Sequence, residues 1–138
     1  FIGMPQMNFF DAKLLNEGGT YSVSVGGYKV ALSAEKQKNL AARQAAAQDI
    51  TLGVRPSHMV LAKQAGNTLT ATVEVSEMMG SEVHFHANAE GKDVVVIVPT
   101  MDANGEHIDS FRSGDKLNLT FSGNICHVFD KNGKNLEF

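Results

Sequence analysis

The chain of 138 residues is 43% hydrophobic and 20% charged, which is the composition of a folded domain and excludes a disordered chain. Its net charge of −3 creates no field that attracts polyanions, so we expect protein partners and no nucleic acid. The single cysteine, Cys126, excludes an internal disulfide and indicates a reducing, cytoplasmic compartment.

No apolar run approaches the roughly 20 residues that a membrane-spanning helix needs. The first ten residues, "FIGMPQMNFF", lack the basic and then apolar pattern of a signal peptide. Because this start is already apolar and has no initiator Met, we expect the chain to be a segment of a longer polypeptide.

The segment 20–32, "TYSVSVGGYKVAL", predicts a β-hairpin. Tyr21, Val23 and Val25 alternate with serines, and Gly26-Gly27 supplies the positive φ that a tight turn requires. Residues 33–48, "SAEKQKNLAARQAAAQ", are rich in helix formers and contain no Gly or Pro.

A helix is therefore expected over residues 33–48. Ser33 can cap its first turn, and Glu35 suits the positive end of the helix dipole. Leu40 is its one large apolar side chain, which predicts a helix on the surface of the domain or a partly helical connection. The composition shift across this helix is the only sign of a subdivision of 1–138 into 1–50 and 51–138.

The second half predicts short strands at 68–77, 82–90, 92–99 and 115–121, and a final strand with a hairpin around Asn132-Gly133. The apolar run 94–98 predicts a strand buried on both faces. About nine strands in all predict a mainly all-β fold. Its second half favours an OB-like small β-barrel, preceded by additional N-terminal strands and one short helix.

The segment "LGVRPSHMVL" (52–61) combines a serine with a histidine, the residue types of a nucleophile and its base. Neighbouring side chains of an extended segment point to opposite faces and no nearby acid orients His58, so we expect no catalysis by Ser57 and His58. Pro56 keeps Arg55 extended, so the strand should end or bend here. Arg55 should then bridge two parts of the domain through a carboxylate or backbone carbonyls, with Glu77 and Glu82 as the candidate carboxylates.

Other polar clusters do not have the spacing that a metal or phosphate site requires. His84 and His86 share the wet face of an expected strand, Cys126 and His127 are adjacent, and segment 102–106, "DANGE", lacks the EF-hand spacing. No glycine-rich segment has the spacing of a phosphate loop, so no metal, ATP or other cofactor is expected in this chain.

The phenylalanines of the second half are expected in the core, because basic residues are not interleaved with them as in a nucleic-acid groove; they are Phe85, Phe111, Phe121 and Phe129. Met78-Met79, beside Gly80, is typical of an adaptable contact surface or of a core turn, and the sequence leaves both open.

Five motifs, taken in their order along the chain, resemble those of a known protein family. They are "FIGMPQMNFF" (1–10), "LGVRPSH" (52–58), "VEVSEMMGSE" (73–82), "GDKLNLTF" (114–121) and "CHVFDKNGKNL" (126–136). Together they resemble the C-terminal regulatory region, a transport-associated OB-type (TOBE) domain, of the ATP-binding subunits of bacterial carbohydrate-importing ABC transporters. These are the maltose, multiple-sugar and glycerol-phosphate type importers.

The resemblance assigns family-motif positions residue by residue. The positions are Gly3, Pro5, Met7 and Asn8 in the linker motif, Gly53, Arg55 and Pro56 in the central motif, Val75, Glu77, Gly80 and Glu82 in the third, and Gly114, Asp115, His127, Phe129 and Asp130 in the closing motifs. Ser57 departs from the family, which commonly has Glu there. The helix at 33–48 lies where family members vary.

The resemblance implies a non-catalytic regulatory and dimerisation domain, peripheral on the inner face of the cell membrane through the transporter complex. Its implied partners are its own ATPase domain, a second copy of the subunit, cytoplasmic regulatory proteins and, indirectly, the membrane subunits. ATP and Mg would bind only in the ATPase domain. The alternative is a barrel that senses a small oxyanion or sugar, with backbone amides at polar turns cradling the ligand.

Overall fold

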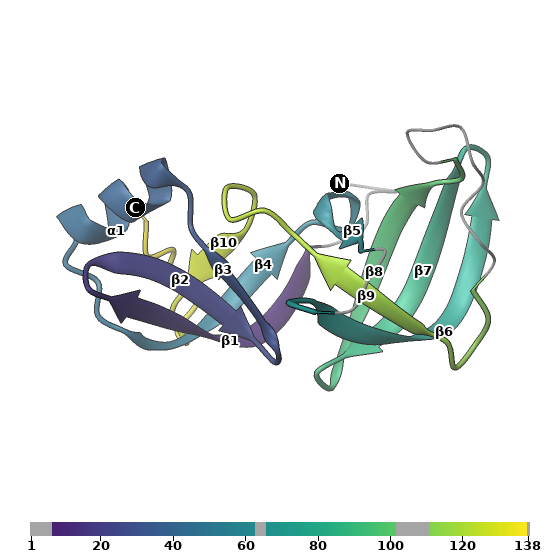
Figure 1. Ribbon diagram of the computed structural model, residues 1–138, viewed down its shortest axis with the longest axis horizontal. Coiled ribbons are helices and arrows are strands. Elements are labelled where there is room, and N and C mark those ends of the chain that lie inside the picture. The colour runs from purple at the N-terminus through teal and green to yellow at the C-terminus, as the bar shows by residue number, and fades with distance from the viewer. Residues whose placement is uncertain (1–6, 63–65, 102–110, 138) are drawn as a thin grey trace.

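Two antiparallel five-stranded sheets form the body of the molecule (Figure 1). The computed structural model describes residues 7–62, 66–101 and 111–137. The first sheet has the order β10-β4-β1-β2-β3 and contains β1 (Asn8–Glu17), β2 (Thr20–Val25), β3 (Tyr28–Ala31), β4 (Gln48–Val54) and β10 (His127–Phe129). The second has the order β5-β9-β6-β7-β8 and contains β5 (Val60–Leu61), β6 (Leu69–Met79), β7 (Glu82–Ala89), β8 (Lys92–Pro99) and β9 (Lys116–Thr120).

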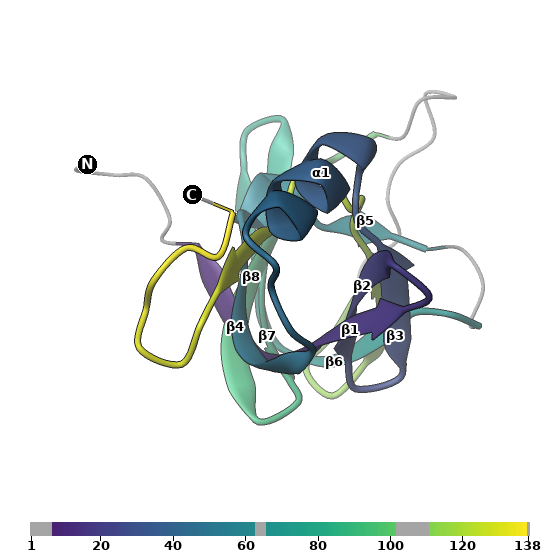
Figure 2. The same cartoon turned by 90° about the vertical axis from the view of Figure 1, so that its left-hand side faces the viewer.

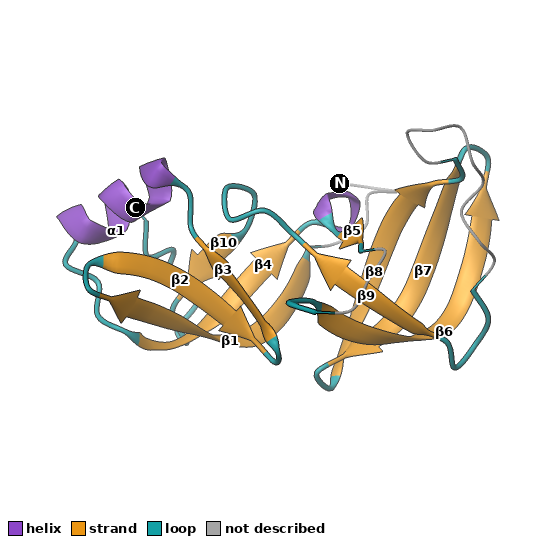
Figure 3. Cartoon of the chain, viewed as in Figure 1, coloured by secondary structure: helices purple, strands orange, loops and turns teal. Residues whose placement is uncertain are grey.

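The predicted all-β, OB-like fold is confirmed. Figure 3 shows strands along the whole described chain, with α1 (Ala34–Ala42) inserted between β3 and β4 and a short 3₁₀ helix, η1 (Pro56–His58), after β4. Viewed from the end that carries α1, the strands curl around a common centre (Figure 2). The first sheet has five strands, the number found in a partly open OB-type barrel. Along the chain, β1, β2 and β3 precede α1, and β4 and β10 follow it.

The assignment of strands to sheets differs from the expectation in one respect. The final strand, β10, does not complete the second sheet but returns to pair with β4, with His127 opposite Gly53 and Phe129 opposite Thr51. Residue 50 lies inside β4, so the sheets are not divided at that point. Subdivision into domains at 50 and 51 stays a prediction.

Period-two alternation places the core between the curled sheets. In β1, Phe10, Ala12 and Leu14 are buried while the residues between them face solvent. In β8, Val94, Val96 and Val98 are buried but their neighbours are only half-buried, so the expectation of a strand buried on both faces is wrong. This strand lies at the edge of its sheet, and one of its faces remains partly open.

The helix begins where predicted and ends six residues early. The Ser33 side chain accepts a hydrogen bond from the Lys36 backbone N–H, and Leu40 is fully buried. The chain leaves the helix at Arg43, and Gln44 has a positive φ of 51°. The alanines of 45–47 offer little apolar area to bury, so nothing holds a further helical turn against the sheet.

A buried ion pair attaches this helix to the end of the chain. The Lys36 ammonium group lies 2.9 Å from both carboxylate oxygens of Glu137, and the side chain of Glu137 is only 3% exposed. Removing one partner of such a pair leaves a buried charge without its counterion, which costs about 3–5 kcal/mol. The pair therefore fixes residues 135–137 beside α1.

The hairpin turns match the predictions. Gly26, with a φ of 55°, turns β2 into β3, and Gly91, with a φ of 76°, turns β7 into β8. The two turns also meet, because a Cβ on Gly26 would overlap the carboxylate of Glu90. The positive φ of 55° is what favours glycine at position 26, because the exposed Glu90 side chain could move away from a Cβ there.

Two asparagine side chains join the sheets. Asn8, 5% exposed at the start of β1, donates to the Val95 carbonyl at 2.7 Å and accepts from the Val95 N–H at 2.9 Å. In the reverse direction, Asn67 of the second half donates to the Lys29 carbonyl at 2.7 Å and accepts from the Lys29 N–H at 2.9 Å. Each carboxamide takes the place of a peptide group beside an edge strand and satisfies a donor and an acceptor there.

We predict that Asn8→Ala lowers the free energy of unfolding by about 2–3 kcal/mol, because the Val95 N–H and C=O would lose their partners in a part-buried site. Asn16→Ala is the matched control, since the Asn16 side chain accepts one exposed, local bond from Gly19. The control should cost under about 1 kcal/mol. Urea unfolding measures both, and equal losses would contradict the role given to Asn8.

Candidate functional site

The family-motif residues that the structure describes, from Met7 onward, lie on different elements and do not converge on one reacting centre. Gly53 is the point where β1, β4 and β10 meet, with Phe9 and His127 opposite it. A Cβ on Gly53 would overlap the Met7 sulfur and approach Phe129 Cε2 to 3.2 Å. The glycine allows these side chains to cover the sheet, and Phe9 and Phe129 pack edge to face with centroids 6.3 Å apart.

Asp130 organises the turn that follows β10. Its carboxylate accepts hydrogen bonds at 2.9 Å from the backbone N–H groups of Asn132 and Lys134, and its own backbone pairs with that of Lys134. Gly133 completes the turn with a φ of 88°. The closing motif therefore encodes an aspartate-stabilised turn, the predicted hairpin around Asn132-Gly133.

The central motif forms the predicted bend. Pro56 is buried at the start of η1, and Arg55 precedes it with the extended φ and ψ of −67° and 145°. The carboxylates proposed for Arg55 are otherwise engaged: Glu77 lies 2.6 Å from His86 Nε2, and Glu82 lies 3.8 Å from His84 Nε2. No ion pair joins Arg55 to either glutamate, so the expected bridge from Arg55 to Glu77 or Glu82 is wrong.

Gly114 and Asp115 anchor a bulge in β6. The Gly114 N–H donates to the Val73 carbonyl at 2.7 Å, and the Val73 N–H donates to the Asp115 carbonyl at 2.8 Å. The register of β6 against β7 shifts between Val73 and Val75 at the same place. Such a bulge bends the strand and turns its far end away from the rest of the sheet.

The far end of β6 carries exposed apolar side chains. We call Val75, Met78, Met79 and Gly80 the β6–β7 tip; Val75, Met78 and Met79 are 54%, 71% and 53% exposed. Figure 1 shows this hairpin at the end of the long axis opposite α1. The exposure decides between the two readings of Met78-Met79, which belong to a surface and not to a core turn. Glu77 and Gly80 of the third motif belong to the same hairpin.

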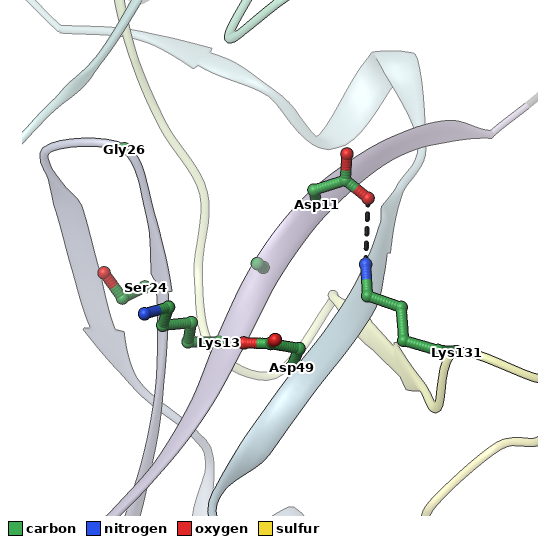
Figure 4. A pocket seen from close by; sticks show the side chains of 7 residues that line it. Asp11, Lys13, Ser24, Gly26, Asp49 and Lys131 are labelled. Carbon is green, nitrogen blue, oxygen red and sulfur yellow. Dashed lines mark hydrogen bonds and ion pairs between the residues drawn. The ribbon is translucent and has the colours of Figure 1, made fainter.

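Two adjoining hollows lie on the outer face of the first sheet. The charged hollow, of about 510 Å³, is lined by Asp11, Ala12, Lys13, Ser24, Gly26, Asp49 and Lys131 (Figure 4). The aromatic hollow, of about 310 Å³, is lined by Phe9, Thr51, Phe129, Asp130, Lys131 and Gly133. Lys131 belongs to both and lies 2.9 Å from Asp11, and Lys92 approaches Asp11 at 3.4 Å. These lysines hold the pKa of Asp11 below its usual value.

The remaining candidate chemical groups are not assembled. Ser57 and His58 are both exposed, and the part of the chain that the structure describes contains no group of three or more His, Cys, Asp and Glu side chains able to hold a metal. Burial raises the pKa of the Cys126 thiol to about 11, which leaves it protonated and unreactive. Gly3, Pro5, His107 and the segment 102–106 lie outside the described residues.

The described helices include none that is long and apolar enough to cross a membrane. The fold and its surfaces thus define an OB-type domain, and the surfaces of its described residues that are open to a partner or ligand include the β6–β7 tip and the two hollows.

Comparison with known proteins identifies the family. The TOBE domain matches residues 52–129, and the MalK OB fold domain matches residues 3–59. The chain therefore belongs to the TOBE domain family, and the resemblance seen in the sequence is confirmed. The TOBE domain is non-catalytic, as expected for this chain.

Three curated relatives are importer ATP-binding proteins. The chain is 29% identical over 97% of its length to the maltose/maltodextrin import protein MalK of Vibrio parahaemolyticus, and 34% over 96% to the sn-glycerol-3-phosphate import protein UgpC of Chromohalobacter salexigens. It is 27% identical over 94% to the oligosaccharides import protein MsmX of Bacillus subtilis. It spans about a third of the length of these relatives, 34%, 32% and 34% respectively.

A solved structure has the same fold. The cytoplasmic molybdate-binding protein ModG, crystallised with molybdate bound, superposes with a TM-score of 0.64 over 94% of this chain and 99% of that chain. The two sequences are only 17% identical, so this comparison shows that the folds are alike and nothing about function.

His127 provides a test of the β10 placement. Burial lowers the pKa of its imidazole below the ordinary 6.5, and Lys36 adds to the effect. In the unfolded chain the imidazole binds protons more readily, so its contribution to stability is present above pH 6.5 and is lost as the pH falls below that value.

We predict an NMR titration midpoint for His127 below 6.5 in the folded chain and near 6.5 in urea. His127→Gln should make the melting temperature less sensitive to pH below 6.5. A folded midpoint at or above the value in urea would show that β10 does not bury this side chain.

Proposed function

We propose that this chain is the regulatory and dimerisation domain of the ATP-binding subunit of a carbohydrate-importing ABC transporter. The names of its relatives and their greater length support an ATPase domain elsewhere in the parent polypeptide, where ATP and Mg would bind. The subunit would act on the cytoplasmic side of the membrane, in contact with its own ATPase domain, a second copy of itself and, through the complex, the membrane subunits. Cytoplasmic regulatory proteins are further candidate partners.

The observation that carries this proposal is the β6–β7 tip. Val75 and Met79 lie on one face of β6 and Met78 on the other, and exposed apolar side chains concentrated at one end of a domain mark protein contacts. Methionine is flexible and polarisable, so it adapts to a partner surface. The tip is also held firmly, because the Thr100 N–H donates to the Ser81 carbonyl at 2.8 Å and ties the end of β8 to the turn. A rigid hairpin that presents apolar side chains suits a contact with a second copy.

The size of the tip indicates that self-association of this chain alone is weak. A stable interface takes about 800 Å² from each partner, about a tenth of the 8090 Å² surface of the chain. Three side chains on one hairpin supply only part of that area. The ATPase domain would have to contribute the rest of a stable dimer.

We predict that sedimentation over a concentration series shows a weak dimer and that Met78→Glu shifts it to monomer, because the charge would lose its water in the contact. Val60→Glu is the control, since Val60 on β5 is 55% exposed and lies outside the tip. A dimer that Val60→Glu disrupts and Met78→Glu leaves intact would place the contact elsewhere. A coding sequence without a phosphate-loop ATPase beside this domain would overturn the transporter assignment.

The alternative function is a sensor for a small oxyanion or sugar. The molybdate bound to ModG supports the oxyanion form of this proposal only through the shared fold. Calorimetry with molybdate, tungstate and phosphate tests it, and no heat at millimolar ligand would discard the oxyanion form.

A further inference from the structure

We propose that the two hollows on the outer face of the first sheet together form a binding site for a neutral carbohydrate. This inference rests on the sugar form of the alternative function above, and it does not depend on self-association at the β6–β7 tip, which lies on the second sheet. It rests on the charge balance, the hydrogen-bonding groups and the aromatic side chains that the two hollows bring together.

The charged hollow is electrically balanced. Its two lysines, Lys13 and Lys131, match its two aspartates, Asp11 and Asp49, in formal charge. At the rim, Glu90 lies against Gly26 and Lys92 lies 3.4 Å from Asp11, so these two charges also oppose each other. A phosphate or other oxyanion entering here would meet carboxylates as well as ammonium groups. A neutral ligand would meet no net repulsion.

The hydrogen-bonding groups of this hollow suit hydroxyl groups. Register places Asp49 opposite Lys13 and Lys13 opposite Ser24 in one row across three strands, all on the outer face. Among the ion pairs of the described residues none joins Lys13 to Asp49, so the ammonium donor and the carboxylate acceptor both remain available. A sugar hydroxyl donates and accepts at once, which matches a row of alternating donors and acceptors.

The aromatic hollow supplies the apolar part of the site. Phe9 is 48% exposed and meets Phe129 at an angle of 62°, so two ring surfaces border the hollow. Sugars have apolar C–H faces as well as hydroxyls, and rings of this kind offer them a surface to pack on. Lys131 borders both hollows, which makes the polar and aromatic parts continuous.

The volumes of the two hollows suit a small ligand. OB-type barrels bind oligosaccharides and oligonucleotides on the face of strands 2 and 3, and Ser24 of β2 is the lining residue that belongs to those strands. Both volumes lie within or near the range of about 300–1,000 Å³ that small-ligand sites occupy. The net negative charge of the chain disfavours the oligonucleotide.

The test is a two-dimensional NMR titration of the 138-residue chain with maltotriose, cellotriose and raffinose. We expect at least one of them to bind with a Kd of about 1 mM and to shift the amides of Lys13, Ser24, Asp49 and Thr51. Glucose 6-phosphate should bind no more tightly than glucose, because the site has no net positive charge.

Two variants locate the site. Asp49→Asn and Phe9→Ala should each weaken binding by about tenfold, whereas Lys116→Ala, on the second sheet and outside both hollows, should leave it unchanged. The inference is overturned if none of the three sugars shifts an amide at 50-fold higher concentration than that Kd, about 50 mM. Preferential binding of glucose 6-phosphate or molybdate, or shifts confined to the second sheet, would also overturn it.

Discussion

The two hydrogen bonds between the Asn8 carboxamide and the backbone of Val95 are the constraint on which the arrangement of this molecule depends. The two sheets share no strand, and backbone pairing alone would leave the edge strand β8 open at this point. A carboxamide is the one uncharged side-chain group, found in Asn and Gln, that donates and accepts like a peptide group. Asn67 makes the reciprocal contact with Lys29, so each sheet covers an edge of the other.

The functional surfaces follow from this junction. Lys92 of β8 reaches Asp11 of β1 only because the sheets are held side by side, so the charge balance at this lining residue of the charged hollow depends on the contact between them. The same junction leaves the outer face of the first sheet and the β6–β7 tip open to solvent. The two surfaces lie on different sheets, so a protein partner and a small ligand would not compete for the same residues.

Local chemistry made much of the fold predictable from the sequence. The alternation in 20–32, the glycines of the hairpin turns and Pro56 each act within a few residues, and the structure confirms what they indicated. The end of α1 was not predictable from helix propensity, because it depends on whether the sheet offers anything to bury against residues 43–48. The ion pair of Lys36 with Glu137 joins residues 101 apart, and no local pattern signals it.

The roles of the motif residues were also not predictable from local sequence patterns. The order of the motifs was enough to indicate the family, but not what each residue does. The sequence suggested that Arg55 bridges the domain, whereas the side chains that join the two sheets include Asn8 and Asn67. The only signal for Asn8 was its place in the linker motif. The hollows combine β1, β2, β4 and the turn after β10, and this combination exists only once β10 has returned to the first sheet.

Amide hydrogen exchange at Val95 tests the central constraint most directly. In the unaltered chain the Val95 N–H is bonded to the Asn8 side chain, so its exchange should be slow although it lies on the outer edge of β8. In Asn8→Ala its exchange should become fast, while the amides of Val94 and Val96 on the same strand remain protected. Unchanged protection of Val95 in that variant would show that something other than Asn8 holds the two sheets together.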